Sequence, residues 1–314
     1  MNNSFKKINV IGGWFCFVFA SMVYLLTMEP TASFWDCSEF IATSYKLEVG
    51  HPPGAPLFMM ISRFFTMFAG PQHAALMVNA MSALASGATI MFLFWSITHL
   101  ARRAMRKREN ELSMPQTIAV IGAGLVGSIA YTFTDTFWFS AVEGEVYALS
   151  SFFTAIVFWA ILKWENVADE PHANRWLILI AYLTGLAIGV HLLNLLIIPP
   201  IVLIYYFRKY SVTKWGVVKA LLVSAAILVA AMFIIIPGTI QLGALFDRLF
   251  VNTFGLPFNS GITVYAFALF AALAWGVYLT HKKGKVLANT ILLCVTVVIL
   301  GYSSYASVVI RSAA

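Results

Sequence analysis

Apolar stretches about as long as a bilayer is thick recur along most of this 314-residue chain. A helix that crosses the hydrocarbon core needs about 20 predominantly apolar residues. Segments that meet this requirement lie near residues 8–28, 74–100, 115–134, 146–163, 215–237, 262–280 and 286–305. Hydrophobic residues make up 61% of the sequence and charged residues only 11%, whereas about a quarter of a soluble domain is charged. The sequence therefore predicts an all-α polytopic membrane protein.

The apolar segment Leu177–Phe207 is too long for one crossing, because its 31 residues would form a helix of about 46 Å in a hydrocarbon core of about 30 Å. Basic residues are concentrated in cytoplasmic loops. The strong basic clusters of this chain are Lys6–Lys7, Arg102–Arg108, Arg208–Lys209 with Lys214, and Lys282–Lys285. All four clusters share the cytoplasmic side if the segment forms a hairpin of two short helices joined near Gly189–Asn194. We therefore expect about nine transmembrane helices, a cytoplasmic N-terminus, and a return helix that is kinked or unwound by Pro199 and Pro200.

This topology places five stretches on the outer face of the membrane: residues 29–73, 135–145, 190–194, 238–261 and those after about 306. Eight of the 13 acidic residues fall in these stretches, namely Glu29, Asp36, Glu39, Glu48, Asp135, Glu143, Glu145 and Asp247. The chemistry of the protein is therefore expected at the outer face. Within the first outer loop, residues 29–73, an apolar stretch near residues 55–70 carries Arg63 and is too short to cross. It is predicted to form a helix along the membrane surface, with an early start of the next transmembrane helix as the alternative.

Several classes of site are disfavoured by the sequence. The net charge of +7 reflects basic clusters between apolar segments rather than a nucleic-acid surface. Cys16, Cys37 and Cys294 show neither a CxxC pattern nor a Cys/His spacing, so neither a disulfide framework nor a zinc site is predicted. The chain has no Walker, GxSxG, HExxH or dinucleotide-binding motif, which removes the usual support for nucleotide-driven transport, serine hydrolysis and zinc proteolysis.

The first outer loop holds the densest polar chemistry, in the sequence SFWDCSEFIATSYKLEVGHPPGAPLF, residues 33–58. Asp36 and Glu39 would lie on one face of a helix, and a carboxylate half-buried beside aromatic residues is suited to act as a base near neutral pH. The alternative is that Asp36 caps the helix and Glu39 stabilises its first turn. The GHPPGAP segment predicts a rigid turn, which presents His51 either to a substrate or only incidentally.

Further candidates lie in the other outer stretches. Glu143 and Glu145 reach the same face of the membrane, although anchoring beside Tyr147 and stabilisation of a helix dipole are alternative roles. His191 and Asn194 lie amid apolar residues, where polar groups are costly and commonly functional; a packing hydrogen bond is the alternative for His191. The outer arginines that are suited to bind a phosphate, or to remain solvated at the headgroups, are Arg63, Arg248 and Arg311.

Three motifs resemble a bacterial membrane protein family related to the eukaryotic protein O-mannosyltransferases. The first is WDCSEFIATSYKLEVGHPPGAPLF, in which an Asp is followed by a Glu after two residues and by a His-Pro-Pro-Gly turn about a dozen residues later. The stretch AVEGEVYALSSF resembles the family's second outer motif, and GLAIGVHLLNLL resembles its hairpin motif. The resemblance covers nearly the whole chain, and it implies that residues 1–314 form the N-terminal membrane domain of a longer protein with a large extracytoplasmic region.

The resemblance implies a GT-C glycosyltransferase, a multi-helix enzyme that transfers a sugar, here expected to be mannose, from a polyprenyl-phosphate donor. Carried onto this sequence, Asp36 is the catalytic base with Glu39 as its partner, and it takes the proton of a Ser or Thr hydroxyl of an exported protein, with inversion at the sugar. The residues expected to bind substrate or donor are His51, Arg63, Glu143, Glu145, His191, Asn194, Arg248 and Arg311. No metal and no cofactor are expected, because a cation of the protein would neutralise the leaving phosphate. The expected location is the bacterial inner membrane, with the active site on the extracytoplasmic face.

Two other classes of function remain open from the sequence. A transporter or lipid flippase would use the kinked hairpin with His191 as a midplane site, and it would keep its polar groups at mid-membrane. A non-catalytic subunit that anchors an outer-face partner would tolerate replacement of Asp36 and Glu39 by their amides. The concentration of acids in the outer stretches favours the enzyme.

Overall fold

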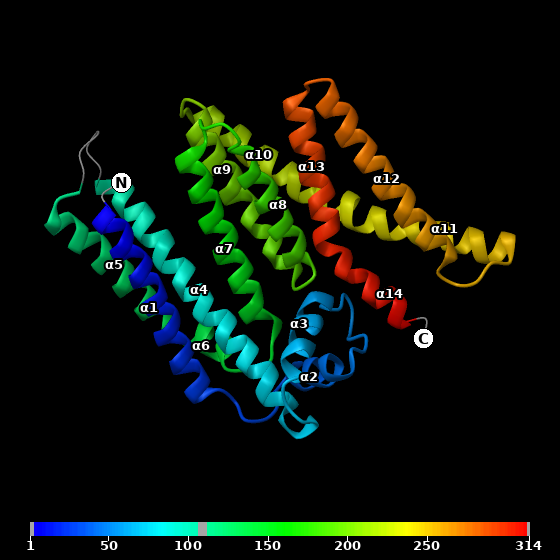
Figure 1. Ribbon diagram of the computed structural model, residues 1–314, viewed down its shortest axis with the longest axis horizontal. Helices are drawn as coiled ribbons and strands as arrows, with labels where there is room; N and C mark the ends of the chain where they lie inside the picture. The colour runs from blue at the N-terminus through cyan, green and yellow to red at the C-terminus, as the bar shows by residue number, and fades with distance from the viewer. Residues whose placement is uncertain (1–2, 106–111, 313–314) are drawn as a thin grey trace. The chain divides into compact units, whose positions relative to one another are not determined.

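A computed structural model describes residues 3–105 and 112–312 of the chain, and every regular element in these ranges is a helix (Figure 1). Eight helical runs among the described residues are long and apolar enough to cross a membrane. These runs are Ser4–Thr27, Pro71–Met105, Met114–Thr132, Val146–Val167, Leu192–Lys209, Lys214–Phe254, Ser260–Lys282 and Val286–Arg311. A shorter apolar helix covers Asn174–Ile188. The prediction of an all-α polytopic membrane protein is therefore confirmed; residues 106–108 of the second basic cluster lie outside the described ranges.

The chain forms two compact units. The first unit contains residues 1–162 together with 189–194, and the second contains residues 163–188 and 195–314. The helices of the first unit are α1 (Asn3–Thr27), α2 (Cys37–Lys46), α3 (Pro56–Thr66), η1 (Pro71–His73), α4 (Ala74–Met105), α5 (Met114–Thr132), α6 (Asp135–Ala141) and most of α7 (Val146–Val167).

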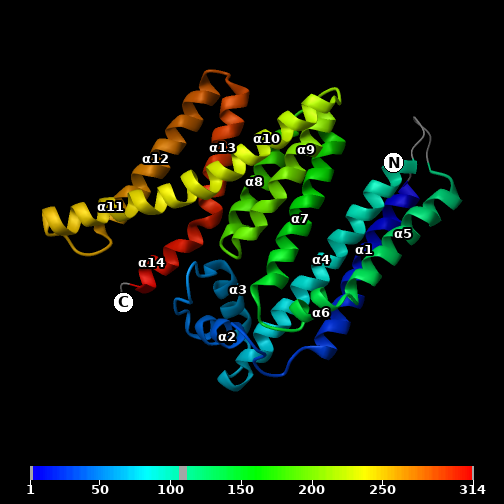
Figure 2. The same ribbon diagram turned by 180° about the vertical axis from the view of Figure 1, so that it is seen from behind.

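The core of the first unit lies where α1 packs along α4 and α5, which run side by side in Figures 1 and 2. Glycines permit this close approach, because a Cβ atom at Gly13 would lie 2.2 Å from the indole nitrogen of Trp95. Near the end of α1, the fully buried Tyr24 donates its hydroxyl hydrogen to the Thr132 carbonyl oxygen at 2.9 Å. This bond satisfies the polar end of a buried aromatic side chain, and it fixes the point where the chain leaves α1 for the first outer loop.

The apolar stretch of the first outer loop forms α3, a helix separate from the one that follows it. α3 ends at Thr66, and α4 begins at Ala74 after the short 3-10 turn η1. The alternative of an early start to the next transmembrane helix is therefore wrong, whereas its placement along the membrane surface stays a prediction.

The segment 177–207 breaks into two helices, as its length predicts. α8 (Asn174–Ile188) ends just before residues 189–191, and the chain then continues through the 3-10 helix η2 (Leu192–Ile197) into α9 (Ile198–Lys209). Pro199 and Pro200 do not kink the return helix, because they occupy its first turn, where a missing N–H leaves no hydrogen bond unmade. The irregular backbone is the 3-10 segment in front of them.

The second unit is built from the remaining helices. Besides the end of α7, α8, the second half of η2, and α9, they are α10 (Lys214–Ala230), the π-helical η3 (Ala231–Ile235), α11 (Ile236–Phe254), α12 (Ser260–Lys282), α13 (Val286–Gly301), η4 (Tyr302–Tyr305) and α14 (Ala306–Ser312). The transmembrane segment expected at 215–237 does not end there, because α10, η3 and α11 form one continuous run of 41 residues. The π-helical segment ends at Ile235, two positions before Pro237, where an altered hydrogen-bond pattern accommodates the missing N–H.

Two glycines bring α8 and α13 into backbone contact within the second unit. A Cβ atom at Gly185 would lie 2.5 Å from the Val298 carbonyl oxygen, and one at Gly301 would lie 2.6 Å from the Gly185 carbonyl carbon. Without a hydrophobic force between helices in lipid, such small-residue contacts carry much of the packing energy.

Replacement of Gly185 by Leu is expected to force the α8 and α13 backbones apart and to destabilise the protein by roughly 1–3 kcal/mol. The matched control is Gly122→Leu in α5, where an added Cβ atom would meet no atom within 4 Å. Thermal unfolding of the purified protein in detergent measures the difference. Equal melting temperatures for the two variants would contradict a tight α8–α13 contact.

Candidate active site

The three sequence motifs meet within the first unit. The backbone N–H of Leu57 at the start of α3 donates to the Gly189 carbonyl oxygen at 2.9 Å, which ties the first outer loop to the hairpin tip. The N–H of Glu29 donates to the Val142 carbonyl oxygen at 3.0 Å, which ties the start of the same loop to the turn between α6 and α7. Each of these two bonds joins residues more than 100 positions apart in the sequence, so only the fold makes the motifs one site.

A buried amide holds the start of the outer loop in place. Asn79 on α4 is fully buried, and its Nδ2 donates to the carbonyl oxygens of Glu29 at 2.6 Å and Thr31 at 3.0 Å. Sequence reasoning missed Asn79, although an Asn near the start of a long apolar helix is the kind of signal that marks a polar contact in a membrane protein.

Asp36 stands immediately before α2 with its side chain available. It occupies the N-cap position, yet its carboxylate makes no capping hydrogen bond with the described residues. The side chain is 58% exposed, and the backbone carbonyl, rather than the carboxylate, accepts from the Phe40 N–H at 2.9 Å. The capping alternative for Asp36 is therefore wrong, and its carboxylate is available for chemistry.

Glu39 and His51 form a close pair beside Asp36. Glu39 Oε1 accepts from the backbone N–H of His51 at 2.6 Å, and Glu39 Oε2 lies 3.0 Å from His51 Nδ1. The other ring nitrogen, Nε2, lies 3.9 Å from Asp36 Oδ2. The backbone and ring hydrogen bonds from His51 lower the pKa of Glu39, and the hydrogen bond to Glu39 raises the pKa of His51. Glu39 therefore fixes the histidine ring and favours its charged form.

The HPPG segment is the rigid turn that presents His51, as predicted. The Gly54 N–H donates to the His51 carbonyl oxygen at 2.7 Å, and Gly54 adopts a φ of 69°, which glycine accepts without steric cost. Pro56 then starts α3, where a proline is well tolerated. The turn thus connects the Glu39–His51 pair to the helix that contacts the hairpin tip.

Asp36, Glu39 and His51 also offer a possible donor set for a metal ion. One ligand atom from each residue lies within 4.8 Å of the other two. Two carboxylates and an imidazole suit a divalent transition metal. Metal independence stays a prediction.

The turn between α6 and α7 brings in two buried carboxylates. Glu143 and Glu145 are each only 6% exposed. Between them, Gly144 packs so tightly that an added Cβ atom would lie 2.9 Å from Val78 Cγ1 and 3.1 Å from Asn79 Oδ1 on α4. Close contact with α4 therefore sets the direction of both carboxylates.

Burial is the main cause that raises the pKa of Glu143 and of Glu145. Ser33 donates its hydroxyl hydrogen to Glu143 Oε2, which opposes the rise for Glu143. The pKa of Glu145 is raised to about 7, first by burial and then by the neighbouring Glu143. Glu145 therefore changes its protonation state near neutral pH.

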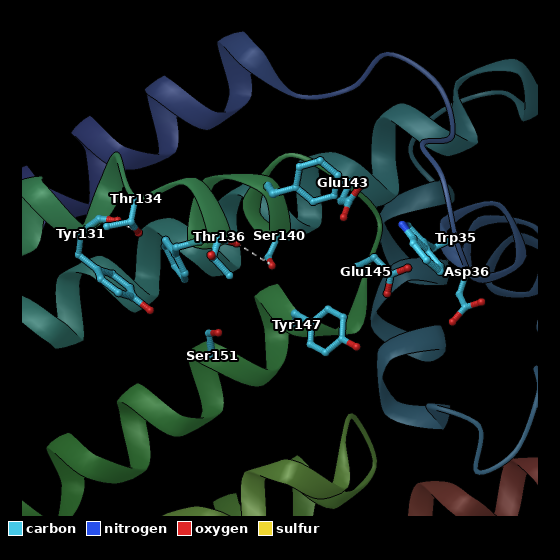
Figure 3. A pocket seen from close by; sticks show the side chains of 12 residues that line it. Trp35, Asp36, Tyr131, Thr134, Thr136, Ser140, Glu143, Glu145, Tyr147 and Ser151 are labelled. Atoms are coloured by element: carbon cyan, nitrogen blue, oxygen red, sulfur yellow. Dashed lines mark hydrogen bonds between the residues drawn. The ribbon is translucent and has the colours of Figure 1, made fainter.

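A cavity of about 860 Å³ joins Asp36 to this turn. It is lined by Trp35, Asp36, Tyr131, Thr134, Thr136, Phe137, Phe139, Ser140, Glu143, Glu145, Tyr147 and Ser151. Figure 3 shows Glu145 between Glu143 and the Trp35–Asp36 pair, with Tyr147, Ser140 and Thr136 along the wall. The lining combines aromatic rings, hydroxyls and carboxylates, which suits a ligand rich in hydroxyl groups.

Trp35 is a cavity residue for which the sequence predicted no role. Its side chain is 88% exposed and its φ is 62°, a left-handed conformation that costs a non-glycine residue roughly 1–2 kcal/mol. The aromatic ring beside Asp36 was visible in the sequence, but its place at the cavity follows from the backbone conformation.

The hairpin residues lie beside the cavity rather than in its lining. The His191 ring packs against the Tyr147 ring with centroids 5.6 Å apart, and its Nδ1 accepts from the Leu193 N–H at 3.2 Å. Asn194 is buried, and its Oδ1 accepts from the hydroxyls of Ser150 at 2.8 Å and Thr154 at 3.0 Å. These contacts position the hairpin tip against α7, and a role in donor binding stays a prediction for both residues.

The three candidate arginines are dispersed over the two units. Arg63 lies in the last turn of α3 with its guanidinium 5.1 Å from the centre of the Tyr45 ring, and it does not line the cavity. Arg248 borders a second cavity of about 320 Å³ within the second unit. Arg311 lies exposed in the last turn of α14. Phosphate binding by any of them stays a prediction.

The Glu39–His51 pair predicts a specific titration. In the native protein the pKa of His51 should lie above the ordinary value of about 6.5, and Glu39→Gln should return it toward that value, because the carboxylate that stabilises the imidazolium is lost. The raised pKa of His51 stabilises the folded state fully at pH values below the ordinary pKa of the imidazole, and this contribution is lost as pH rises through the raised pKa. The lowered pKa of Glu39 stabilises the folded state above the ordinary pKa of the carboxyl, and that contribution is lost as pH falls through the lowered pKa.

NMR titration of histidine-labelled protein, with the signal assigned by His51→Gln, measures the shift. Glu48→Gln is the control, since Glu48 pairs with Lys46 at 3.7 Å. An unchanged His51 titration in Glu39→Gln would contradict the hydrogen-bonded pair.

Comparison with known proteins shows that the chain is similar to members of one protein family. A family model described as the protein O-mannosyl-transferase TMEM260 N-terminal domain matches residues 36–214. The chain is 23% identical over 195 residues to protein O-mannosyl-transferase tmem260 of Dictyostelium discoideum, covering 58% of this chain and 22% of that protein. It is 21% identical over 173 residues to protein O-mannosyl-transferase TMEM260 of Mus musculus, covering 54% of this chain and 22% of that protein.

The matched region thus spans about a fifth of the length of these relatives. No solved structure matches the chain. The family match begins at Asp36 and includes Glu39, His51, both acids of the α6–α7 turn and the hairpin tip, so it covers every residue of the cavity lining except Trp35. More than half of the chain is matched, and the protein belongs to the family of the TMEM260 N-terminal domain of protein O-mannosyl-transferases.

Proposed function

We propose that the protein is a membrane glycosyltransferase that moves mannose from a polyprenyl-phosphate donor to Ser or Thr hydroxyls of exported proteins, with inversion. The observation that carries the proposal is the uncapped, exposed carboxylate of Asp36 at a cavity lined by hydroxyls and aromatic rings. The names of the relatives support mannosyl transfer to protein. The apolar helices support a donor held in the bilayer by its lipid tail, with the reaction on the extracytoplasmic face.

In this mechanism Asp36 is the general base. Its carboxylate takes the proton of the acceptor hydroxyl while that oxygen attacks the anomeric carbon of the sugar. The bond from the anomeric carbon to the phosphate oxygen breaks on the opposite face, and the lipid phosphate leaves with the electron pair. One base positioned in this way contributes about 10²- to 10⁴-fold to the rate.

Glu39 and His51 position the base in this proposal. The distance of 3.9 Å between His51 Nε2 and Asp36 Oδ2 is too long for a hydrogen bond, so the Asp36 oxygens stay available for the proton of the acceptor. The same distance permits a favourable interaction between a charged imidazole and the carboxylate. Glu39 holds the ring in place through two contacts.

Replacement of Asp36 by Asn should reduce sugar transfer by at least about 10²-fold, because the amide cannot accept the proton. Mass spectrometry of exported proteins from cells that express the full-length protein or its variant measures the sugar-mass shift. Glu48→Gln is the matched control, since Glu48 is exposed on the same outer loop and pairs with Lys46.

Unchanged glycosylation in Asp36→Asn would show that Asp36 is not the base. Failure of the unmodified protein to transfer sugar from a polyprenyl-phosphate donor would refute the proposed enzymatic function. The functions that remain would be those of a transporter or of a subunit that anchors a partner. The anchoring subunit also requires that the amide variants keep its partner bound.

A further inference from the structure

The cavity presents an electrostatic conflict with the donor. Three carboxylates line it, from Asp36, Glu143 and Glu145, and none of the described lining residues is a lysine, arginine or histidine. A sugar linked to a lipid through a phosphodiester carries a negative charge. In a partly buried site the repulsion between like charges is much stronger than in water. At least one of these acids must therefore be neutral when the donor binds, unless a cation accompanies it.

Glu145 has the geometry of the neutral acid. Its side chain is buried, whereas Asp36 is exposed to solvent, which stabilises a carboxylate. It lies between Glu143 and Asp36 in the cavity wall (Figure 3). The backbone N–H of Val146, at the start of α7, donates to its carboxyl group. A protonated carboxyl can accept this bond with its carbonyl oxygen and keep its O–H free to donate into the cavity.

Glu143 is less suited to this role. Its Oε2 already accepts from the Ser33 hydroxyl, a bond that favours the carboxylate form. A charged Glu143 in turn makes ionisation of its neighbour more costly, and the two acids are expected to share one proton, with Glu145 as its main holder.

The other groups around Glu145 act in both directions. Burial has the largest influence on the pKa of Glu145 and raises it. The charges of Glu143 and Asp36 raise it further, whereas His51 lowers it. The phenols of Tyr131 and Tyr147 also line the cavity. The resulting pKa of about 7 means that a modest change in pH, or an approaching anion, shifts the population toward the acid.

We propose that Glu145 binds the donor in its protonated form and donates a hydrogen bond from its carboxyl O–H to an oxygen of the anionic sugar phosphate. This inference rests on the proposed function, because that function supplies the anionic donor. It assigns opposite tasks to two acids of one cavity: Asp36 is charged and receives a proton, whereas Glu145 is neutral and donates a hydrogen bond. The hydroxyls of Thr136 and Ser151 add neutral polar groups to the same wall, whereas the Ser140 hydroxyl donates to the Thr136 carbonyl oxygen at 3.2 Å.

The test is the pH dependence of donor binding, measured without turnover. A polyprenyl-phosphate mannose is bound to the Asp36→Asn protein in detergent micelles, from about pH 6 to about pH 8.5, and compared with Asp36→Asn/Glu145→Gln. The phosphodiester keeps one charge over this range, so its own titration does not contribute. The affinity of the first protein should fall about tenfold for each unit of pH above the pKa of Glu145. The Gln variant, which is a permanent hydrogen-bond donor, should lose this fall and bind more tightly at the alkaline end.

Two further variants on the same background separate other titrating groups. Glu143→Gln, which changes the neighbouring acid, should lower the midpoint but keep the pH dependence, because it removes a charge that favours the protonated Glu145. His51→Gln removes the other group expected to titrate nearby, and the pH dependence due to Glu145 should survive it. Melting temperatures of all variants confirm that each is folded.

Three outcomes overturn the proposal. Donor affinity that is independent of pH in the Asp36→Asn protein would show that Glu145 does not bind as an acid, while the proposed function would stand. The same pH dependence with Gln at position 145 would assign the titration to another group. Absence of donor binding at every pH, together with absence of transfer by the unmodified protein, would refute the proposed function and this inference with it.

Discussion

Hydrocarbon offers no hydrogen-bond partners, so a chain segment that enters it must satisfy its own backbone as a helix. This constraint makes the described chain all-helical and leaves the turns between helices as the places where carboxylates collect. Those turns need fixed positions if they are to form a site. A few buried contacts provide them, chiefly the Asn79 amide that holds the start of the first outer loop and the close approach of Gly144 to α4.

The same contacts determine the electrostatics of the cavity. Because Gly144 presses the α6–α7 turn against α4, Glu143 and Glu145 are buried next to each other, and the pKa of each is raised. Asp36 belongs to the more open first outer loop and keeps a solvent-exposed carboxylate. One cavity therefore contains acids in two environments, and in enzymes such a difference in environment is how acids take on different roles.

Much of the architecture could be predicted from the sequence, because hydropathy, segment length and proline position act locally. The hairpin at 177–207 and the rigid turn that presents His51 were predicted for this reason. The roles of single side chains were harder to predict than the architecture. An Asp at a helix start is a plausible cap, yet Asp36 makes no capping bond, and the prolines at 199 and 200 begin a helix rather than bend one. The proline outcome depends on the exact start of a helix, which propensity leaves undetermined by one or two residues. Asp36 does occupy the N-cap, but its φ of −81° and ψ of −2° are helical, whereas a capping residue usually has extended backbone angles.

The sequence by itself determined that the protein spans a membrane, that its acids gather between the helices, and that Asp36, Glu39 and His51 lie within one short loop. Each of these facts depends on composition or on neighbours along the chain. Only the tertiary structure decided that Glu145 joins Asp36 at one cavity and that Asn79 supports the loop, since these residues are far apart in sequence and meet through helix packing. Burial, the property that gives Glu145 its raised pKa, belongs to that packing rather than to the residue type.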